Sequence, residues 1–146
     1  MRVQEGDRMK AYLSACADTV LSLTDKIALR APVVVEEYKA KLAERIQTLL
    51  NGVEVDRTRL ATEVALFADK ASIDEEISRL HSHLASMRQL LDAEEPSGRK
   101  LDFVVQEMNR EFNTIGSKAN DGELTTLVLT GKAEIEKIRE QVQNIE

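Results

Sequence analysis

Residues 73–91, IDEEISRLHSHLASMRQLL, decide the fold class, because apolar side chains recur in them every three or four residues. This spacing places one apolar stripe along an α-helix, whereas a half-buried strand would alternate at every second residue. The stripe keeps a heptad rhythm, which is typical of a helix that packs against another helix. Its members are Ile73, Ile77, Leu80, Leu84, Met87 and Leu91. The pattern leaves open whether the facing helix belongs to the same chain or to a second copy.

Residues 124–145 carry a second apolar stripe with the same rhythm. Its members are Leu124, Val128, Gly131, Ile135, Ile138, Val142 and Ile145. Two such seams present more apolar edge than a chain of five or six helices needs for its own core. We therefore expect the chain to self-associate, with a bundle inside one chain as the alternative interpretation.

The first 52 residues are predicted to form two helices. Apolar residues at helical spacing lie on both sides of Pro32, which is acceptable in the first turn of a new helix. Asn51 and Gly52 form a strong C-terminal stop. We therefore expect an antiparallel helical hairpin over residues 1–52.

The remaining residues, 56–146, predict further helices. Asp56 and Asp121 are placed to cap helices, and Ser72 begins a Ser-Ile-Asp-Glu capping box. No stretch alternates like a strand. The predicted fold class is all-α, a helical bundle of long antiparallel helices with coiled-coil-like packing in one domain.

The composition narrows the possible functions. The chain has 146 residues, and 42% of them are hydrophobic, so it can bury a core. Its net charge of −6 makes nucleic acid an unexpected partner on average charge alone. Cys16 is the single cysteine, which excludes an internal disulfide and a cysteine-based zinc site. No apolar stretch has the length of a signal core or a membrane span. These features predict a protein of the cytoplasm without a membrane partner.

Residues 106–121, QEMNREFNTIGSKAND, hold several poor helix formers in an otherwise helical region. Each costs several tenths of a kcal/mol against alanine, and glycine costs about 1 kcal/mol. A helical wheel places Leu101, Val104, Val105, Met108, Phe112 and Ile115 in one buried arc. One flank holds Lys100, Glu107, Glu111, Thr114 and Lys118, and the other holds Asp102, Gln106, Asn109 and Asn113. The costly residues therefore line the edges of the buried arc.

The same region is the least acidic part of the chain. Residues 97–118 contain four basic and three acidic side chains, a net charge of +1, which leaves −7 for the rest. The basic residues are Arg99, Lys100, Arg110 and Lys118. A phosphate backbone is tolerated best at such a strip.

A possible proton-transfer group lies on the preceding helix. Glu76, Arg79 and His83 share one flank of that helix, and histidine is suited to proton transfer near neutral pH. A structural hydrogen bond between His83 and a carboxylate is the more ordinary interpretation. Glu107 and Glu111, spaced by four residues, have the oxygen ligands that a divalent cation prefers, but they also fit a solvated helix edge.

The sequence resembles the YicC-like endoribonuclease family, a bacterial family long described as stress-induced. The likeness rests on GRKLDFVVQEMNREFNTIGSKAND at 98–121, on AEIEKIREQVQNIE at 133–146 and on ADKASIDEEISRLHSHL at 68–84. The opening MRVQEG also resembles the start of the family's helical region. A match of this length is far more specific than a short motif.

The resemblance implies a metal-assisted hydrolase that cleaves RNA and assembles as a homohexamer. It also implies that residues 1–146 form the C-terminal helical domain, with 56–146 as the region typical of the family, and that an N-terminal α/β domain is missing. The positions that fit the family's pattern are Glu75, Glu76, Arg79, His83, Arg99, Lys100, Asp102, Glu107, Asn109, Arg110, Glu111, Asn113, Thr114, Ser117 and Lys118.

Two hypotheses follow for the function. In the first, the chain is half of an endoribonuclease, with catalytic residues His83, Glu76, Glu107 and Glu111. Glu107 and Glu111, together with Asp102 or Glu76, would hold manganese or magnesium. The RNA-binding residues would be Arg79, Arg99, Lys100, Asn109, Arg110, Asn113, Thr114, Ser117 and Lys118. No aromatic platform for base stacking is evident, so recognition by RNA shape is expected.

In the second hypothesis, the chain is a structural oligomerisation or RNA-binding module, and the chemistry lies on the missing domain. The polar strip would then be an interface network that fixes the register of packed helices.

Overall fold

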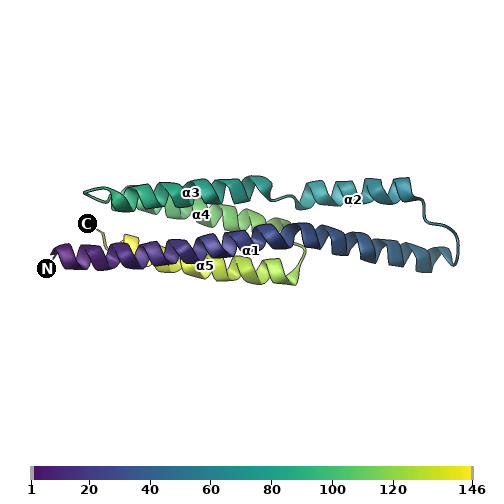
Figure 1. The fold of residues 1–146 in the computed structure, drawn as a ribbon, viewed down its shortest axis with the longest axis horizontal. Coiled ribbons are helices and arrows are strands. Elements are labelled where there is room, and N and C mark those ends of the chain that lie inside the picture. The colour runs from purple at the N-terminus through teal and green to yellow at the C-terminus, as the bar shows by residue number, and fades with distance from the viewer. Residues whose placement is uncertain (1, 146) are drawn as a thin grey trace.

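The computed structural model describes residues 2–145, with side chains from residue 5 onward, and these residues form five helices (Figure 1). The helices are α1 (Arg2–Leu50), α2 (Arg57–Ala71), α3 (Asp74–Asp92), α4 (Gly98–Lys118) and α5 (Gly122–Val142). The described chain contains no strand, so the all-α prediction is confirmed. The predicted domain ends, Met1 and Glu146, lie outside the described residues.

The first half of α1 packs with α3, α4 and α5 in a four-helix bundle. Going around the bundle, α1 contacts α3, α3 contacts α4, α4 contacts α5, and α5 contacts α1, each pair running antiparallel (Figure 1). The largest fully buried side chains come from all four helices, among them Leu13, Ile27, Leu80, Met87, Leu101, Met108, Phe112 and Ile138. No described helix is long and apolar enough to cross a membrane.

Both heptad seams are buried inside this bundle. On α3 every seam residue is buried except Ile77, which is half-buried, and on α5 the stripe is buried from Leu124 to Val142. The intramolecular bundle is therefore the correct interpretation of these seams. The argument that their apolar edges require a second copy is wrong, because α1 and α4 already cover them.

The predicted hairpin over residues 1–52 is also wrong, because α1 runs without a break through Pro32. Its first half packs on the bundle and its second half packs on α2, and the apolar spacing stays in phase between them. This burial offsets the cost of proline in a helix interior, about 3 kcal/mol. The stop at Asn51 and Gly52 is confirmed, and both residues have a positive φ, 49° and 95°.

The true hairpin joins the second half of α1 to α2, and we call residues 33–71 the arm. It extends beyond the end of the bundle as a pair of helices (Figure 1). Tyr38 and Phe67 stack between them, with ring centroids 3.8 Å apart. Leu60, Val64 and Phe67 form the inner stripe of α2, but they remain half-exposed, and no residue of α2 is buried.

The helix starts follow the predicted caps at two positions out of three. Asp56 accepts hydrogen bonds from the backbone of Thr58 and Arg59, and Asp121 accepts one from Leu124 at 3.0 Å. The capping box at Ser72 is not formed. Ser72 instead ends α2 in an extended conformation, and α3 begins after Ile73 without a side-chain cap.

An ion pair ties α1 to the turn before α5. Arg30 donates to both carboxylate oxygens of Asp121, at 2.7 and 3.0 Å, and both side chains are largely buried. The hydrogen bonds from Arg30 lower the pKa of Asp121 to about 2, against the effect of burial. Asp121 therefore both caps α5 and fixes α1 across it.

Gly131 allows α4 and α5 to approach closely. A methyl group added at Gly131 would lie 2.6 Å from the Phe112 ring. The Phe112 side chain is fully buried and cannot move aside without opening the core.

Candidate functional site

Two ion pairs follow one another along the edge where α3 meets α4. Lys118 Nζ lies 2.9 Å from Glu76 Oε1, and Arg79 lies 3.5 Å from Glu111 Oε2. Both glutamates are buried, at 3% and 4% exposure, whereas the two cations reach the surface. The two helices run antiparallel, so residue numbers rise along α3 while they fall along α4. Glu76 therefore meets Lys118, and Arg79, one turn further, meets Glu111.

The next turn continues this order. His83 lies one turn beyond Arg79 on α3, and Glu107 lies one turn before Glu111 on α4, so the register places the two at the same level. Both side chains are half-buried. We call the six residues Glu76, Arg79, His83, Glu107, Glu111 and Lys118 the α3–α4 row.

Glu76 is the most constrained member of the row. Lys118 Nζ also donates to the Ser72 carbonyl at 3.0 Å, while Glu76 Oε2 is buried and accepts no hydrogen bond from the described residues. Burial works to raise the pKa of Glu76, but the hydrogen bonds from Lys118 and the backbone outweigh it, and the pKa lies below its ordinary value. Glu76 is therefore ionised at neutral pH, and its geometry suits the positioning of Lys118.

Arg79 is held from two sides. It donates to Glu75 at 3.0 Å on its own helix and faces Glu111 on α4. About half of its side chain remains exposed. A guanidinium fixed by carboxylates and open to solvent has donors left for a phosphate group.

The structure does not bring the three predicted metal ligands together. Asp102 accepts a hydrogen bond from Gln106 on the flank opposite Glu107, and Glu111 faces Arg79. Among the described side chains, no three histidine, cysteine, aspartate or glutamate groups lie close enough to hold one metal ion. A closed metal site made only by side chains of this chain therefore does not fit the described residues.

The two asparagines of the strip lie on the α5 side of α4, away from His83. The Asn113 carbonyl oxygen accepts a hydrogen bond from Lys132 at 2.5 Å. Asn109 lines a polar cavity of about 380 Å³ between α4 and α5, together with Asp102, Gln106, Glu136, Arg139 and Gln143. Asn109 and Asn113, which the first hypothesis groups with Arg79 as RNA-binding residues, therefore face α5 and lie outside the α3–α4 row.

The outward face of α4 carries the remaining candidates. Arg99, Lys100, Arg110 and Ser117 are exposed on it, and the Thr114 hydroxyl donates to the Arg110 carbonyl within the helix. Phe103 lies among them, one turn from Arg99 and two turns from Arg110, and 62% of it is exposed. This exposed ring was not singled out from the sequence. Its signal in the sequence was an aromatic residue outside the buried arc.

Comparison with known proteins agrees with this architecture. The sequence model of the C-terminal domain of YicC-like endoribonucleases matches residues 27–146. The probable endoribonuclease YicC of Clostridioides difficile (strain 630) is 46% identical over 147 aligned residues. That of Haemophilus influenzae (strain ATCC 51907 / DSM 11121 / KW20 / Rd) is 33% identical over 146. Both alignments cover the whole chain and 50% of the relative.

The helical bundle and the α3–α4 row therefore belong to a helical domain of the class that this sequence model describes, a C-terminal domain. The chain belongs to the YicC-like endoribonuclease family, and it spans about half the length of the curated relatives it matches.

Proposed function

We propose that this chain is the C-terminal part of an endoribonuclease and that RNA binds along α4 and the α3–α4 row. The observation that carries the proposal is the open guanidinium of Arg79, fixed between Glu75 and Glu111 beside His83. The names of the two relatives support the same activity, since both are described as probable endoribonucleases. The N-terminal α/β domain implied by the resemblance would complete the active enzyme.

The outward face of α4 would hold the RNA strand. Arg99, Lys100 and Arg110 are exposed there and would pair with phosphates, an interaction that weakens as salt concentration rises. Phe103 would stack on a base, which single-stranded regions offer and a continuous duplex does not. The polar cavity beside Asn109 offers amide donors and acceptors to the same strand.

The chemistry would fall to the exposed members of the row. Arg79 would bind the scissile phosphate and stabilise the negative charge that grows on its oxygens. His83 would accept the proton of the attacking water or of the ribose 2′-hydroxyl. Glu111 and Glu76 would act as positioning residues that hold Arg79 and Lys118, and they would not touch the substrate.

In this proposal a divalent cation binds only together with the RNA, whose phosphate oxygens supply part of its ligands. Magnesium and manganese often bind through one or two carboxylates, with phosphate oxygens and water completing the shell. Glu107 is the half-buried carboxylate of the row that would face such an ion. The role of Glu107 in holding the ion can be tested apart from cleavage. RNA affinity is measured with and without manganese, for the unchanged protein and for Glu107→Gln.

One observation favours a structural role for part of the row. Glu76 is buried and Lys118 bridges it to Ser72, so this pair joins the end of α4 to the junction of α2 and α3. We propose that this pair fixes the junction.

The proposal is tested by cleavage of a labelled, structured RNA. This chain and a protein of its relatives' full length are compared with magnesium, with manganese and with a chelator. Cleavage by the longer protein that is lost in Arg79→Ala, with its fold intact, supports the proposal. Full cleavage by Arg79→Ala excludes the row from the reaction.

A further inference from the structure

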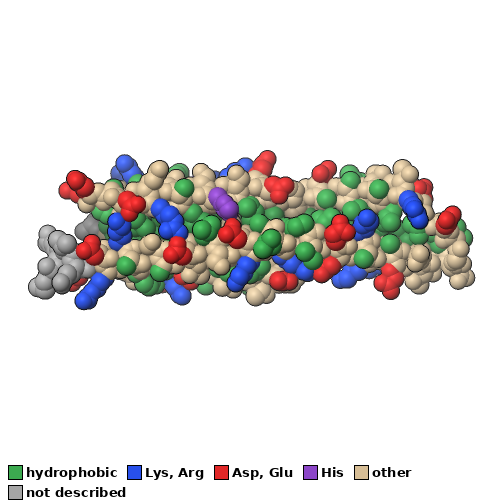
Figure 2. Space-filling model, in the orientation of Figure 1, with side chains coloured by type: hydrophobic (Ala, Val, Ile, Leu, Met, Phe, Trp, Pro, Cys, Tyr) green, Lys and Arg blue, Asp and Glu red, His purple; other side chains and the backbone are tan. Residues whose placement is uncertain are grey.

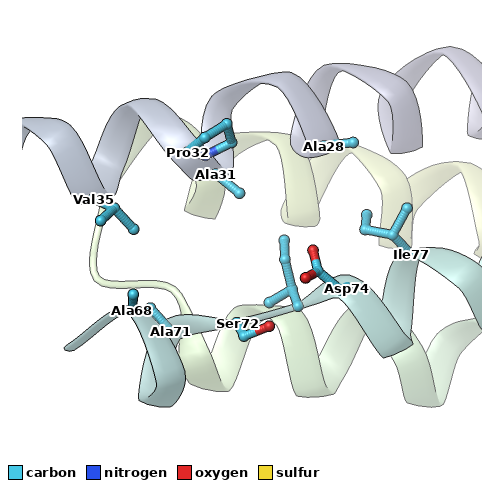
Figure 3. Close-up of a pocket in the computed structure, with 10 residues that line it drawn as sticks. Ala28, Ala31, Pro32, Val35, Ala68, Ala71, Ser72, Asp74 and Ile77 are labelled. Carbon is cyan, nitrogen blue, oxygen red and sulfur yellow. The ribbon is translucent and has the colours of Figure 1, made fainter. Parts of the chain in front are cut away.

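The cavity between α4 and α5 has polar walls over an apolar base. Val105 and Ile135, its two apolar lining residues, are buried in the core. The polar lining residues are Asp102, Gln106 and Asn109 on α4 and Glu136, Arg139 and Gln143 on α5. Its volume of about 380 Å³ is that of a small-molecule site. The cavity at the junction of α2 and α3 has a similar volume, about 340 Å³, but apolar side chains make most of its lining (Figure 3).

The lining of the α4–α5 cavity offers many hydrogen-bonding groups with little net charge. Two carboxylates and one guanidinium give a net charge of −1. Each of the three amides adds one acceptor oxygen and one donor group. A net negative charge disfavours a phosphate inside the cavity, whereas a flat uncharged ring with donors and acceptors on its edges fits its walls. A nucleobase is such a ring.

Two kinds of charged group in the lining distinguish one base from another. Arg139 lies 3.5 Å from Glu136 on its own helix, and about half of each side chain is exposed. Asp102 accepts a hydrogen bond from Gln106 through one of its two carboxylate oxygens. A guanidinium fork pairs with two adjacent acceptors, and a carboxylate pairs with two adjacent donors. The cavity therefore suits a base that has both kinds of edge.

Guanine is the RNA base with both kinds of edge. Its O6 and N7 are adjacent acceptors, and its N1–H and N2–H groups are adjacent donors. Arginine bound to O6 and N7 is the commonest base-specific contact in protein–DNA complexes. These edges are both exposed only when the guanine is unpaired, as in a loop or a single strand.

The outward face of α4 borders the cavity. Gln106 in the cavity wall lies one turn from both Phe103 and Arg110, which are exposed. A strand whose phosphates pair with Arg99 and Arg110 can therefore turn one base into the cavity. The α3–α4 row lies on the other flank of α4, about one helix diameter away, roughly 10–12 Å. The base in the cavity would thus lie within a few nucleotides of a phosphate held at the row.

The edge between α1 and α3 differs from this surface, because its basic groups are paired with acidic ones. Lys10 lies 2.9 Å from Asp92, and Arg88 pairs with Asp18. Figure 2 shows acidic and basic side chains interspersed over the face that α1 and α3 form. The outward face of α4 is therefore the better surface for an RNA strand.

We propose that the α4–α5 cavity is a base-specific subsite that takes an unpaired guanine of the RNA. Arg139 would donate to O6 and N7, and a carboxylate of the cavity would accept from N1–H and N2–H. This inference rests on the proposed function, because it needs an RNA strand along α4. It adds recognition of one base to the recognition of RNA shape.

Binding of four labelled oligouridines tests the subsite. One is uridine throughout, and the other three carry a single central guanine, adenine or cytosine. Fluorescence anisotropy measures the affinity of this chain for each. We expect the guanine oligonucleotide to bind at least about fivefold more tightly than the other three, the lower end of what one bidentate base contact contributes. Replacing its guanine by 7-deazaguanine, which lacks the N7 acceptor, should remove most of this preference.

Two variants of α5 separate the guanidinium fork from general charge. Arg139→Lys keeps the charge but loses the planar fork. Its preference for guanine should fall to within about twofold, while its affinity for plain oligouridine stays the same. Lys137→Gln removes an exposed cation that pairs with Glu134 and does not line the cavity. It should weaken binding of all four oligonucleotides alike and keep the preference. Circular dichroism checks that the helices of both variants are unchanged.

The outcomes distinguish the subsite from the proposed function. Equal affinity for the four oligonucleotides overturns the subsite but leaves RNA binding along α4, and so does a preference for guanine that survives Arg139→Lys. No binding of any of these RNAs contradicts the RNA surface of the proposed function and the subsite with it. Full cleavage by Arg79→Ala contradicts the chemistry proposed for the row, whereas a guanine preference lost in Arg139→Lys would still support the subsite.

Discussion

Lys118 at the end of α4 lies 2.9 Å from Glu76, a carboxylate buried in the first turn of α3. The pair spans 42 positions in the sequence and joins two helix ends. Lys118 also reaches the Ser72 carbonyl, so the same ammonium group fixes the point where the arm leaves the bundle.

Removing the cation of this pair should destabilise the fold. Lys118→Met leaves a buried carboxylate without its partner, and we expect a loss of about 1–3 kcal/mol. Glu76→Gln should cost less, and the double variant should cost less than the sum of the two changes, because each single change removes the same contact. Urea unfolding of the four proteins measures this coupling. Additive losses of stability would show that Lys118 and Glu76 do not interact with each other.

The close approach of α4 and α5 predicts an unusual response to alanine. Gly131→Ala should lower the free energy of unfolding by about 1–3 kcal/mol, because the new methyl group meets the Phe112 ring at 2.6 Å. Gly6→Ala in α1 is the matched control, since nothing lies within 4 Å of its added methyl group. Helix propensity alone should make that variant as stable as the unchanged protein or more stable. Equal effects at both positions would contradict the packing.

The ion pair of Arg30 and Asp121 predicts a loss of stability in acid. The pKa of Asp121 is about 2 in the folded chain against a usual 3.8, so its stabilising contribution is complete above pH 4 and disappears as the pH falls to about 2. Asp121→Asn retains a good helix cap but removes this charge. Its melting temperature should therefore change less than that of the unchanged protein between pH 4 and 2. Parallel curves for the two proteins would exclude Asp121 as the titrating group.

The exposed Phe103 should contribute to RNA binding. Phe103→Ala should weaken the affinity for a single-stranded RNA several-fold or more, since stacking on one base contributes about 1–3 kcal/mol. The affinity for a fully paired duplex should change little. Leu129→Ala on α5 removes a side chain of the same exposed fraction and serves as the control. Fluorescence anisotropy measures both affinities, and an equal loss for both RNAs would argue against stacking.

The sequence predicted the elements that depend on local spacing. The stripes of α3 and α5, the buried arc of α4 and the caps at Asp56 and Asp121 are all present, because periodicity and capping are properties of short segments. The continuation of α1 through Pro32 was missed, because its stability comes from packing on distant helices.

The candidate site was predicted only in part for the same reason. A wheel showed which flank each residue occupies, but it did not show that Glu111 faces α3 while Asn109 and Asn113 face α5. The antiparallel register of α3 and α4 brings Lys118 to Glu76, a contact that the spacing within either helix does not specify. The three carboxylates proposed for a metal were separated by the helix itself, since Asp102 and Glu107 lie on opposite flanks.

The central claim, that the α3–α4 row takes part in RNA cleavage, is tested most directly by comparing two histidines on the same helix. His83 lies in the row, whereas His81 faces Asp25 of α1 at 3.3 Å. In a protein of the full length of its relatives, His83→Ala should lower the cleavage rate of a labelled RNA by about 10²–10⁴-fold, and His81→Ala should leave it within a few-fold. Cleavage by His83→Ala at the rate of the unchanged protein would contradict the account.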